Sequence, residues 1–207
     1  MRGDGDGWVV SETGARYWGR HGAAGLLLRA PLPTGAPAVL LQHRAPWSHQ
    51  GGTWGLPGGA RDSHETAEQA AVREAREEAG LPVENVVVRA ALVTARVTAQ
   101  ATAGGSHWTY TTVVADAPHR LATMPNGESA ELRWVLEEEV DGLPLHPGLA
   151  ASWHRLRAAV AVVPAQPGVP RTVELESGNF VWCMPAEPGH QPSPLSESIS
   201  SLLKAPR

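Results

Sequence analysis

The stretch "GGARDSHETAEQAAVREAREEAGL", residues 58–81, places a strongly acidic helix directly after a pair of glycines. Thr66 or Ser63 can cap the start of this helix, acids crowd its first turn, and Gly80 followed by a proline ends it. Only 18% of the residues in the chain are charged, so this concentration of acid is unusual. A solvated surface helix would explain it, and so would a metal site.

Three of the acids lie on one face of the predicted helix. Glu74, Glu77 and Glu78 stand at positions i, i+3 and i+4, which puts neighbouring Cβ atoms roughly 5–6 Å apart. Like charges at this spacing repel, and Arg73 relieves only part of the repulsion by pairing with Glu77. A hard divalent cation such as Mg²⁺ takes oxygen ligands of this kind and would relieve it more fully. The opposite face carries small residues that let the helix approach a sheet closely: Ala67, Ala70, Ala71 and Ala75.

The composition is that of a globular chain with one domain and an appendage. It has 207 residues, 42% of them hydrophobic, and a formal net charge of −4. That charge leaves no basic surface for long nucleic acid or an anionic membrane, and no apolar run approaches the ~20 residues of a membrane span. The single cysteine, Cys183, cannot close an intrachain disulfide, and the N-terminus lacks the basic and apolar parts of a signal peptide. We therefore expect a cytoplasmic protein.

Strand and helix patterns alternate along residues 21–162. Mixed strands with two helices predict an α/β sandwich, in which a mixed sheet lies between helices. Residues 1–20 look like a Gly-rich lead-in, and residues 163–207 like a Pro-rich, partly disordered extension with a β-hairpin over 171–185. We expect the hairpin to pack on the domain, where it could cover a sheet edge, build a homodimer or shape a substrate pocket. The expected strands are 21–30, 37–45, 53–56, 83–99, 107–117 and 130–136, and the second helix is 146–162.

The fixed letters of the acidic stretch resemble the Nudix box. From Gly59 they run Gly, five residues, Glu65, seven residues and then "REAREEAGL" (73–81), which matches Gly-x5-Glu-x7-Arg-Glu-U-x-Glu-Glu-x-Gly-U with U apolar. Ala75 departs softly, since it is smaller than the usual residue at its U position. The segments "WGLPGG" upstream and "ELRWV" downstream extend the resemblance over residues 20–160.

This resemblance implies an α/β/α hydrolase that uses Mg²⁺ or Mn²⁺ and cleaves a nucleoside diphosphate linked to another group. Arg73 would orient the glutamates, Glu65 would be its structural counterpart, and Gly59 and Gly80 would shape the loop and helix. Either Glu74 or Glu77 would be the general base, because a carboxylate can take the proton of an attacking water. The implied metal ligands are the carboxylates of Glu74, Glu77 and Glu78 and the backbone carbonyl of Gly58.

Further site residues are expected outside the box. Many family members add an acid from a later loop, for which Glu128 is the first choice and Glu131 the alternative. Arg44 ends a strand and could reach a substrate phosphate, although a surface arginine would look the same. Trp54 could stack on a base, or it could be a core residue.

The substrate within the family is narrowed by elimination. Val97 stands where ADP-ribose hydrolases have a proline, and Thr98 stands where diadenosine polyphosphate hydrolases have a tyrosine. A MutT-like hydrolase of (deoxy)nucleoside triphosphates, including modified ones, is therefore favoured, with ADP-ribose or a nucleotide sugar as the alternative small-molecule substrate. A non-catalytic nucleotide-sensing module is the alternative of another class, and the intact glutamates argue against it.

Overall fold

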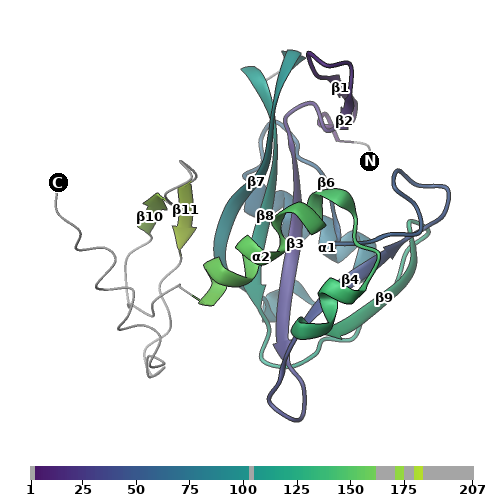
Figure 1. The fold of residues 1–207 in the computed structure, drawn as a ribbon, viewed down its shortest axis with the longest axis vertical. Coiled ribbons are helices and arrows are strands. Elements are labelled where there is room, and N and C mark those ends of the chain that lie inside the picture. Colours follow the sequence, from purple (N-terminus) through teal and green to yellow (C-terminus); the bar gives the residue numbers. More distant parts are fainter. Residues whose placement is uncertain (1–2, 103–104, 162–170, 175–179, 184–207) are drawn as a thin grey trace.

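The computed structural model describes residues 3–102, 105–161, 171–174 and 180–183 (Figure 1). The described strands form a two-stranded hairpin and a nine-stranded sheet in the order β10-β11-β7-β8-β3-β4-β5, with β6 beside β3 and β9 beside β4. Only the β3–β8 pair is parallel among the described pairings of this sheet, so the sheet is mixed as expected. The elements are β1 (Trp8–Val10), β2 (Arg16–Trp18), β3 (Ala23–Pro31), β4 (Pro37–Arg44), β5 (Trp54–Gly55), β6 (Gly58–Ala60), α1 (Ala67–Ala79), η1 (Val83–Asn85), β7 (Val87–Thr102), β8 (Gly105–Asp116), β9 (Ser129–Leu136), η2 (Glu137–Gly142), α2 (Pro147–Ala161), β10 (Arg171–Glu174) and β11 (Phe180–Cys183).

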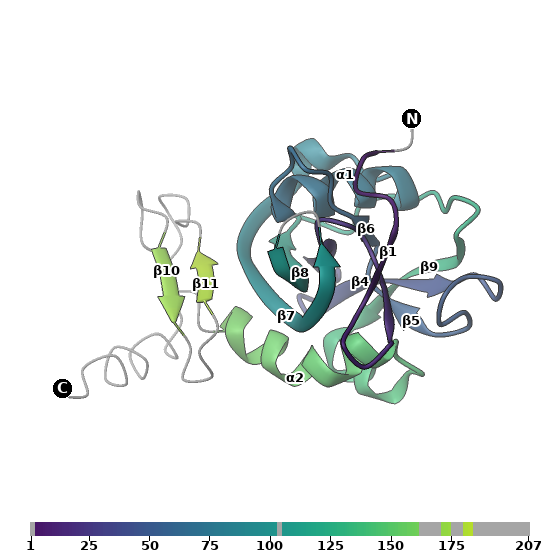
Figure 2. The ribbon, with the colours of Figure 1, turned by 90° about the horizontal axis from the view of Figure 1, so that it is seen from above.

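The two helices cover opposite faces of the sheet, which confirms the predicted sandwich (Figure 2). Strand β3 is buried on both faces, because its side chains alternate between the two layers. Leu26 and Leu28 pack with the alanines of α1, whereas Leu27 packs with Trp153 and Leu156 of α2. The predicted alanine face of α1 is therefore the face that meets the sheet.

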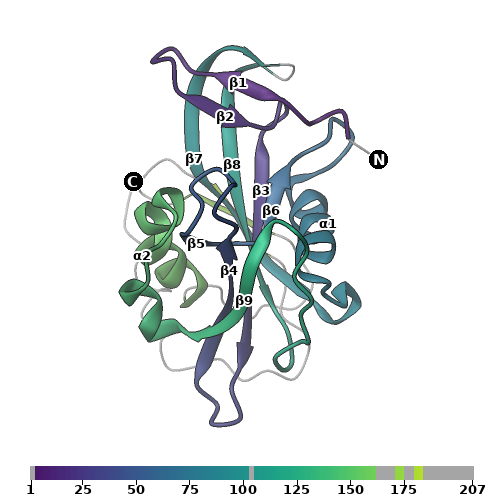
Figure 3. The same ribbon diagram turned by 90° about the vertical axis from the view of Figure 1, so that its right-hand side faces the viewer.

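The N-terminal segment is more ordered than a lead-in. Strands β1 and β2 pair in an antiparallel hairpin that crosses the end of β7 and β8 (Figure 3). Val9 is buried with Trp108, and the Trp108 indole N–H donates to the Trp18 carbonyl at 3.1 Å. Interpreting residues 1–20 as an extended lead-in was therefore incomplete, because three-residue strands are too short to show a clear alternation in sequence.

Two other segments differ from expectation or lie partly outside the described residues. The glycine-rich stretch before α1 forms strand β6, which pairs with β3 although glycine is depleted in strands. Strands β10 and β11 pair as the predicted hairpin would, and β11 also pairs with β7. Residues 175–179 and 184–207, which include the segment predicted to be disordered, lie outside the described residues. Among the described helices, none is long and apolar enough to cross a membrane.

Enlarging an alanine on the buried face of α1 should destabilise the fold. Ala75 is fully buried against the sheet, and we expect Ala75→Leu to lower the free energy of unfolding by ~1–3 kcal/mol through overpacking. Urea denaturation measures the change. Arg76→Leu is the matched control, because Arg76 is the exposed neighbour and leucine has a similar helix propensity. Equal stability of the two variants would contradict close packing at Ala75.

Candidate active site

Helix α1 is fixed at both ends. The Thr66 hydroxyl accepts from the Gln69 amide, and the Gln69 side chain accepts from the Thr66 amide, so the capping box is complete and Thr66, not Ser63, is the cap. At the other end Gly80 adopts a left-handed conformation, with φ 62°, and its N–H donates to the Arg76 carbonyl. Together with the buried alanine face, these caps set the rotation of the helix and hence the direction of its glutamates.

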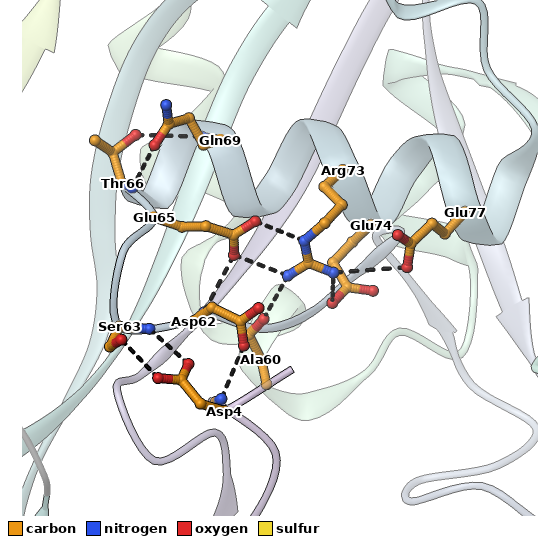
Figure 4. A network of polar contacts seen from close by, with 11 residues as sticks. Asp4, Ala60, Asp62, Ser63, Glu65, Thr66, Gln69, Arg73, Glu74 and Glu77 are labelled. Atoms are coloured by element: carbon orange, nitrogen blue, oxygen red, sulfur yellow. Dashed lines mark hydrogen bonds and ion pairs between the residues drawn. The ribbon is translucent and has the colours of Figure 1, made fainter. Parts of the chain in front are cut away.

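Arg73 lies at the centre of a polar network (Figure 4). Its Nε and Nη2 donate to the two carboxylate oxygens of Glu65 at 2.6 and 2.9 Å, a bidentate pair. Its Nη1 donates to Glu74 at 2.8 Å and lies 3.6 Å from a Glu77 oxygen, and Nη2 also reaches the Ala60 carbonyl. The guanidinium thus ties the loop before α1 to two glutamates of the helix, in the arrangement expected for an orienting residue.

The pKa values of Glu65 and Glu74, two carboxylates of this network, are shifted in opposite directions. Hydrogen bonds from Arg73 hold the pKa of Glu65 below its usual value, with the Asp62 amide donating a further bond. Burial raises the pKa of Glu74, and this effect outweighs the opposing hydrogen bond and charge of Arg73. Glu74 packs directly against Gly59, since a Cβ built there would lie 2.5 Å from its Oε1. Gly59 is therefore required sterically where Glu74 lies.

Glu78 is the most deeply buried of the three helix glutamates. Glu78 is only 5% exposed, and its Oε2 accepts a hydrogen bond from the Gly58 amide at 2.8 Å. Burial raises its pKa to about 8 against the Gly58 hydrogen bond, and the neighbouring charges of Glu74 and Glu128 add to the rise. Gln42 on β4 also donates to it at 3.4 Å, and donates to Ser129 at 2.8 Å.

The backbone carbonyl of Gly58 is directed away from β3. The Leu26 amide donates to the Pro57 carbonyl, and the Arg61 amide donates to the Gly22 carbonyl. In an antiparallel ladder every second pair is hydrogen-bonded, and Gly58, next to Pro57, falls between such pairs. Gly58 then occupies a non-hydrogen-bonded position, in which N–H and C=O both point out of the ladder. The N–H donates to Glu78, and the carbonyl, which the sequence predicts as a metal ligand, points to the same side of the strand.

The donor set fits a hard divalent cation. Glu74, Glu78 and the Gly58 carbonyl supply oxygens from fixed positions, and Glu77, with a side chain 60% exposed, can turn toward them. The three helix glutamates do not gather as tightly as an exposed group of Asp4, Asp62 and His64. That group is the one set of three such side chains among the described residues whose ligand atoms lie within 4.8 Å of one another. The Asp4 carboxylate already accepts hydrogen bonds from the amide and the hydroxyl of Ser63, which accounts for the position of Asp4.

The structure separates the two candidates for the additional acid. Glu128 lies beside Glu78, where its charge and a hydrogen bond contribute to the raised pKa of Glu78. Glu131 instead accepts from the Arg133 guanidinium at 2.8 Å on the surface. Glu128 therefore remains the candidate ligand, and Glu131 has a surface role.

The two substrate-binding candidates differ in accessibility. Arg44 ends β4, and its Nε donates to the His49 carbonyl at 2.8 Å, in the loop between β4 and β5. Trp54 is buried in the core, with its ring stacked on His43 at 4.8 Å and covered by the Arg133 guanidinium at 4.6 Å. We correct its assignment from base stacking to packing, because little of the ring is left to meet a ligand.

Sequence reasoning missed one buried polar residue of the site, Gln42, and named the half-buried Tyr110 only as an aromatic that could stack on a base. Gln42 is 1% exposed, and its Oε1 has no hydrogen-bond partner among the described residues. Tyr110 on β8 lies behind Gly25, where a Cβ would collide with its hydroxyl. Burial raises the pKa of Tyr110, the charge of Glu78 adds to the rise and that of Arg44 opposes it, so both charged groups act on this hydroxyl. A glutamine in the apolar run "AVLLQHR" (38–44) was the available signal for the first.

A mixed sheet between helices, with a glycine strand feeding an acidic helix ordered by Arg73, defines a Nudix fold and site. The model of the NUDIX domain matches residues 19–158, and the chain belongs to this family as a Nudix hydrolase. It is 65% identical over 209 residues to a Mycobacterium tuberculosis protein named "Putative 8-oxo-dGTP diphosphatase 3", covering 98% of this chain and 95% of that one. RenU, a Nudix hydrolase of M. smegmatis, superposes with a TM-score of 0.72 at 70% identity, over 79% of this chain and 100% of its own. A C. elegans Ap4A hydrolase shares the fold, with a TM-score of 0.52 at 22% identity, over 67% and 96%.

Removing the buried acid should change how stability depends on pH. Because the pKa of Glu78 is raised in the folded state, the folded protein binds more protons than the unfolded chain between about pH 4.5 and 8, and stability falls as pH rises through that window. We expect Glu78→Gln to unfold at a higher temperature than the unsubstituted protein at pH 8.5, with a smaller difference at pH 5, when both are measured with a chelator present. About 1 kcal/mol shifts Tm by ~2–4 °C in a chain of this size, so calorimetry resolves the effect.

Glu77→Gln is the matched control for this measurement, since Glu77 is on the same helix but exposed. Its Tm should follow that of the unsubstituted protein across the same pH range. A Glu78→Gln curve parallel to these two would contradict a buried, protonated Glu78.

Proposed function

We propose that this Nudix hydrolase converts (deoxy)nucleoside triphosphates, including those with an oxidised base, to the nucleoside monophosphate and pyrophosphate, using Mg²⁺ or Mn²⁺. The observation that carries the reaction type is the set of acids beside the glycine strand: Glu78 accepts from the Gly58 amide, Glu74 is held by Arg73, and Glu128 lies beside Glu78. The substrate class is supported by the 65% identity, over nearly the whole of both chains, to the relative named as an 8-oxo-dGTP diphosphatase.

The residues proposed to hold the metal are the carboxylates of Glu74, Glu77, Glu78 and Glu128 and the carbonyl of Gly58. A bound divalent cation would neutralise phosphate oxygens and lower the pKa of a coordinated water. Arg73 keeps Glu74 aimed by a 2.8 Å hydrogen bond, while the exposed Glu77 side chain can move with the substrate. Two carboxylates, one fixed and one adjustable, are thus available for the proton of the attacking water.

The chemical step consumes one water. Its oxygen forms a bond to one of the two phosphorus atoms joined by the bridging oxygen as that P–O bond of the anhydride breaks, which separates the nucleoside monophosphate from pyrophosphate. Glu74 or Glu77 accepts the proton that the water loses. Arg44 is proposed to contact a phosphate, because it ends β4 two residues after Gln42, which donates to Glu78.

Neutralising the adjustable glutamate should abolish most of the activity without unfolding the protein. We expect Glu77→Gln to lower kcat on the order of 10²–10⁴-fold, the range for loss of a general base. Glu68→Gln, in the first turn of the same helix, is the control and should keep kcat. Activity is measured as phosphate released after inorganic pyrophosphatase and phosphatase treatment, on 8-oxo-dGTP, common triphosphates, ADP-ribose, nucleotide sugars and dinucleoside polyphosphates.

The panel separates the candidate functions. Preference for ADP-ribose or a nucleotide sugar would replace the proposed substrate while keeping the reaction type. Nucleotide binding without turnover of any compound, by folded protein in Mg²⁺, would favour the sensing module and overturn the proposal.

Metal removal should silence the enzyme reversibly. A chelator is expected to abolish turnover, and added Mg²⁺ or Mn²⁺ to restore it, because the carboxylates alone repel the substrate phosphates. Glu78→Gln should raise the Mg²⁺ concentration that gives half-maximal rate, whereas His64→Ala should leave it unchanged. His64 belongs to the exposed group with Asp4 and Asp62, so a shift in this variant alone would move the catalytic metal to that group.

A further inference from the structure

The N-terminal hairpin presents an aromatic outer face. Trp8 and Trp18 stand directly opposite each other in the β1–β2 register, with ring centroids 5.1 Å apart in an edge-to-face arrangement. Trp8 and Trp18 are 44% and 40% exposed, whereas Val9, the residue after Trp8 on β1, is buried on the opposite face of the hairpin. The Arg16 guanidinium lies 4.8 Å from the Trp8 ring centroid. Two large apolar rings are thus held in place by the inner face yet open to a ligand.

Polar contacts tie the segment that leads into this hairpin to the loop before α1. The Ser63 amide and hydroxyl donate to Asp4 at 2.9 and 2.6 Å, and the Gly5 amide donates to Asp62 at 2.8 Å (Figure 4). This is the same loop that carries Glu65, the partner of Arg73. These hydrogen bonds therefore hold the start of the hairpin segment against the loop that carries Glu65.

A row of rings leads from the hairpin to Arg44. The Trp8 ring lies 6.2 Å from that of His49, in the β4–β5 loop, and the His49 ring lies 6.3 Å from that of His146, which precedes α2. Arg44 donates to the His49 carbonyl at 2.8 Å. A Cβ on Gly55 would lie 3.7 Å from both the Arg44 and the His146 side chains, so these two side chains flank one backbone position.

His146 is held in its neutral form. Burial lowers its pKa to about 4, and the charges of Arg44 and His49 act in the same direction. The Gly148 amide donates to its Nδ1 at 3.1 Å, which leaves the proton on Nε2. The row therefore offers aromatic surface and the His146 Nε2–H donor beside the Arg44 side chain.

We infer that the outer face of the β1–β2 hairpin, with Trp8 as the principal contact, binds the base of the nucleotide substrate next to His49 and His146. This inference rests on the proposed function for the presence of a nucleotide. Aromatic side chains stack on the π-face of any base, and the adjoining Arg44 and carboxylates provide for the phosphates and the metal. The hairpin lies outside residues 19–158, which match the family model, so it can differ among enzymes that share the catalytic helix.

Removing the Trp8 ring tests this assignment by kinetics. Trp8→Ala should raise KM for the preferred nucleoside triphosphate on the order of tenfold with kcat nearly unchanged, and Trp8→Phe should recover most of the affinity. The inhibition constant of inorganic tripolyphosphate, which has no base, should be the same in all variants. Val87→Ala is the matched control, because Val87 is similarly exposed, at 40%, but begins β7, whereas the hairpin segment pairs near the other end of that strand, at Ala99. Far-UV circular dichroism checks that each variant is folded.

Binding of a non-hydrolysable imido analogue, measured by calorimetry in Mg²⁺, separates this inference from the proposed function. A weaker Kd in Trp8→Ala but not in Val87→Ala supports base binding here even if turnover is absent. Hydrolysis with equal KM and equal analogue affinity in Trp8→Ala and the unsubstituted protein overturns the inference and leaves the proposed function standing. Failure of the unsubstituted protein both to bind and to hydrolyse any nucleotide overturns both. If Trp8→Ala also lost inhibition by tripolyphosphate, the inference of base binding would be overturned, since the effect of the substitution would then not involve the base.

Discussion

The close approach of α1 to strands β3 and β6 is the constraint on which the rest of the site depends. Alanines at the interface bring the helix near the sheet, Gly58 lets β6 lie close to the backbone of β3, and Gly59 leaves room for the Glu74 side chain. Glu78 can then reach the Gly58 amide, and Glu74 can lie against Gly59. With larger residues at these positions, the same carboxylates would extend into solvent and have no common geometry.

Close packing has an electrostatic consequence that Arg73 partly offsets. Three carboxylates on one helix face, with Glu128 nearby, would repel strongly in a partly buried site. Arg73 supplies a positive charge to Glu74 and Glu77 and is itself fixed by the bidentate pair with Glu65. Glu78 instead accepts hydrogen bonds from the Gly58 amide and from the Gln42 side chain, and burial dominates its protonation. Burial therefore dominates at Glu78, whereas at Glu74 the hydrogen bond and charge of Arg73 oppose it.

Local features of the site were predictable from the sequence, whereas contacts between distant segments were not. The span of α1, its caps and its alanine face follow from residues within a few turns of one another. Strand β6 and the burial of Trp54 depend on partners from β3, β4 and β9, and composition alone pointed away from the first. The Gln42–Glu78 contact joins residues 36 positions apart, and a short polar residue in an apolar strand carries no mark of its partner. The base-stacking role predicted for Trp54 failed because the burial of its ring likewise depends on residues from distant segments.

The same distinction explains why the box identifies the reaction but not the substrate. Metal binding and water activation need oxygens at fixed spacing, which one loop and one helix can supply. Recognition of a base needs surface from several segments at once, and here Trp8, His49 and His146 come from the N-terminal hairpin, the β4–β5 loop and the start of α2. Each of these segments can change without disturbing the alanine face or Arg73. A reaction centre built from one loop and one helix, with an aromatic surface built separately from other segments, is therefore an arrangement by which one fold can serve different nucleotides.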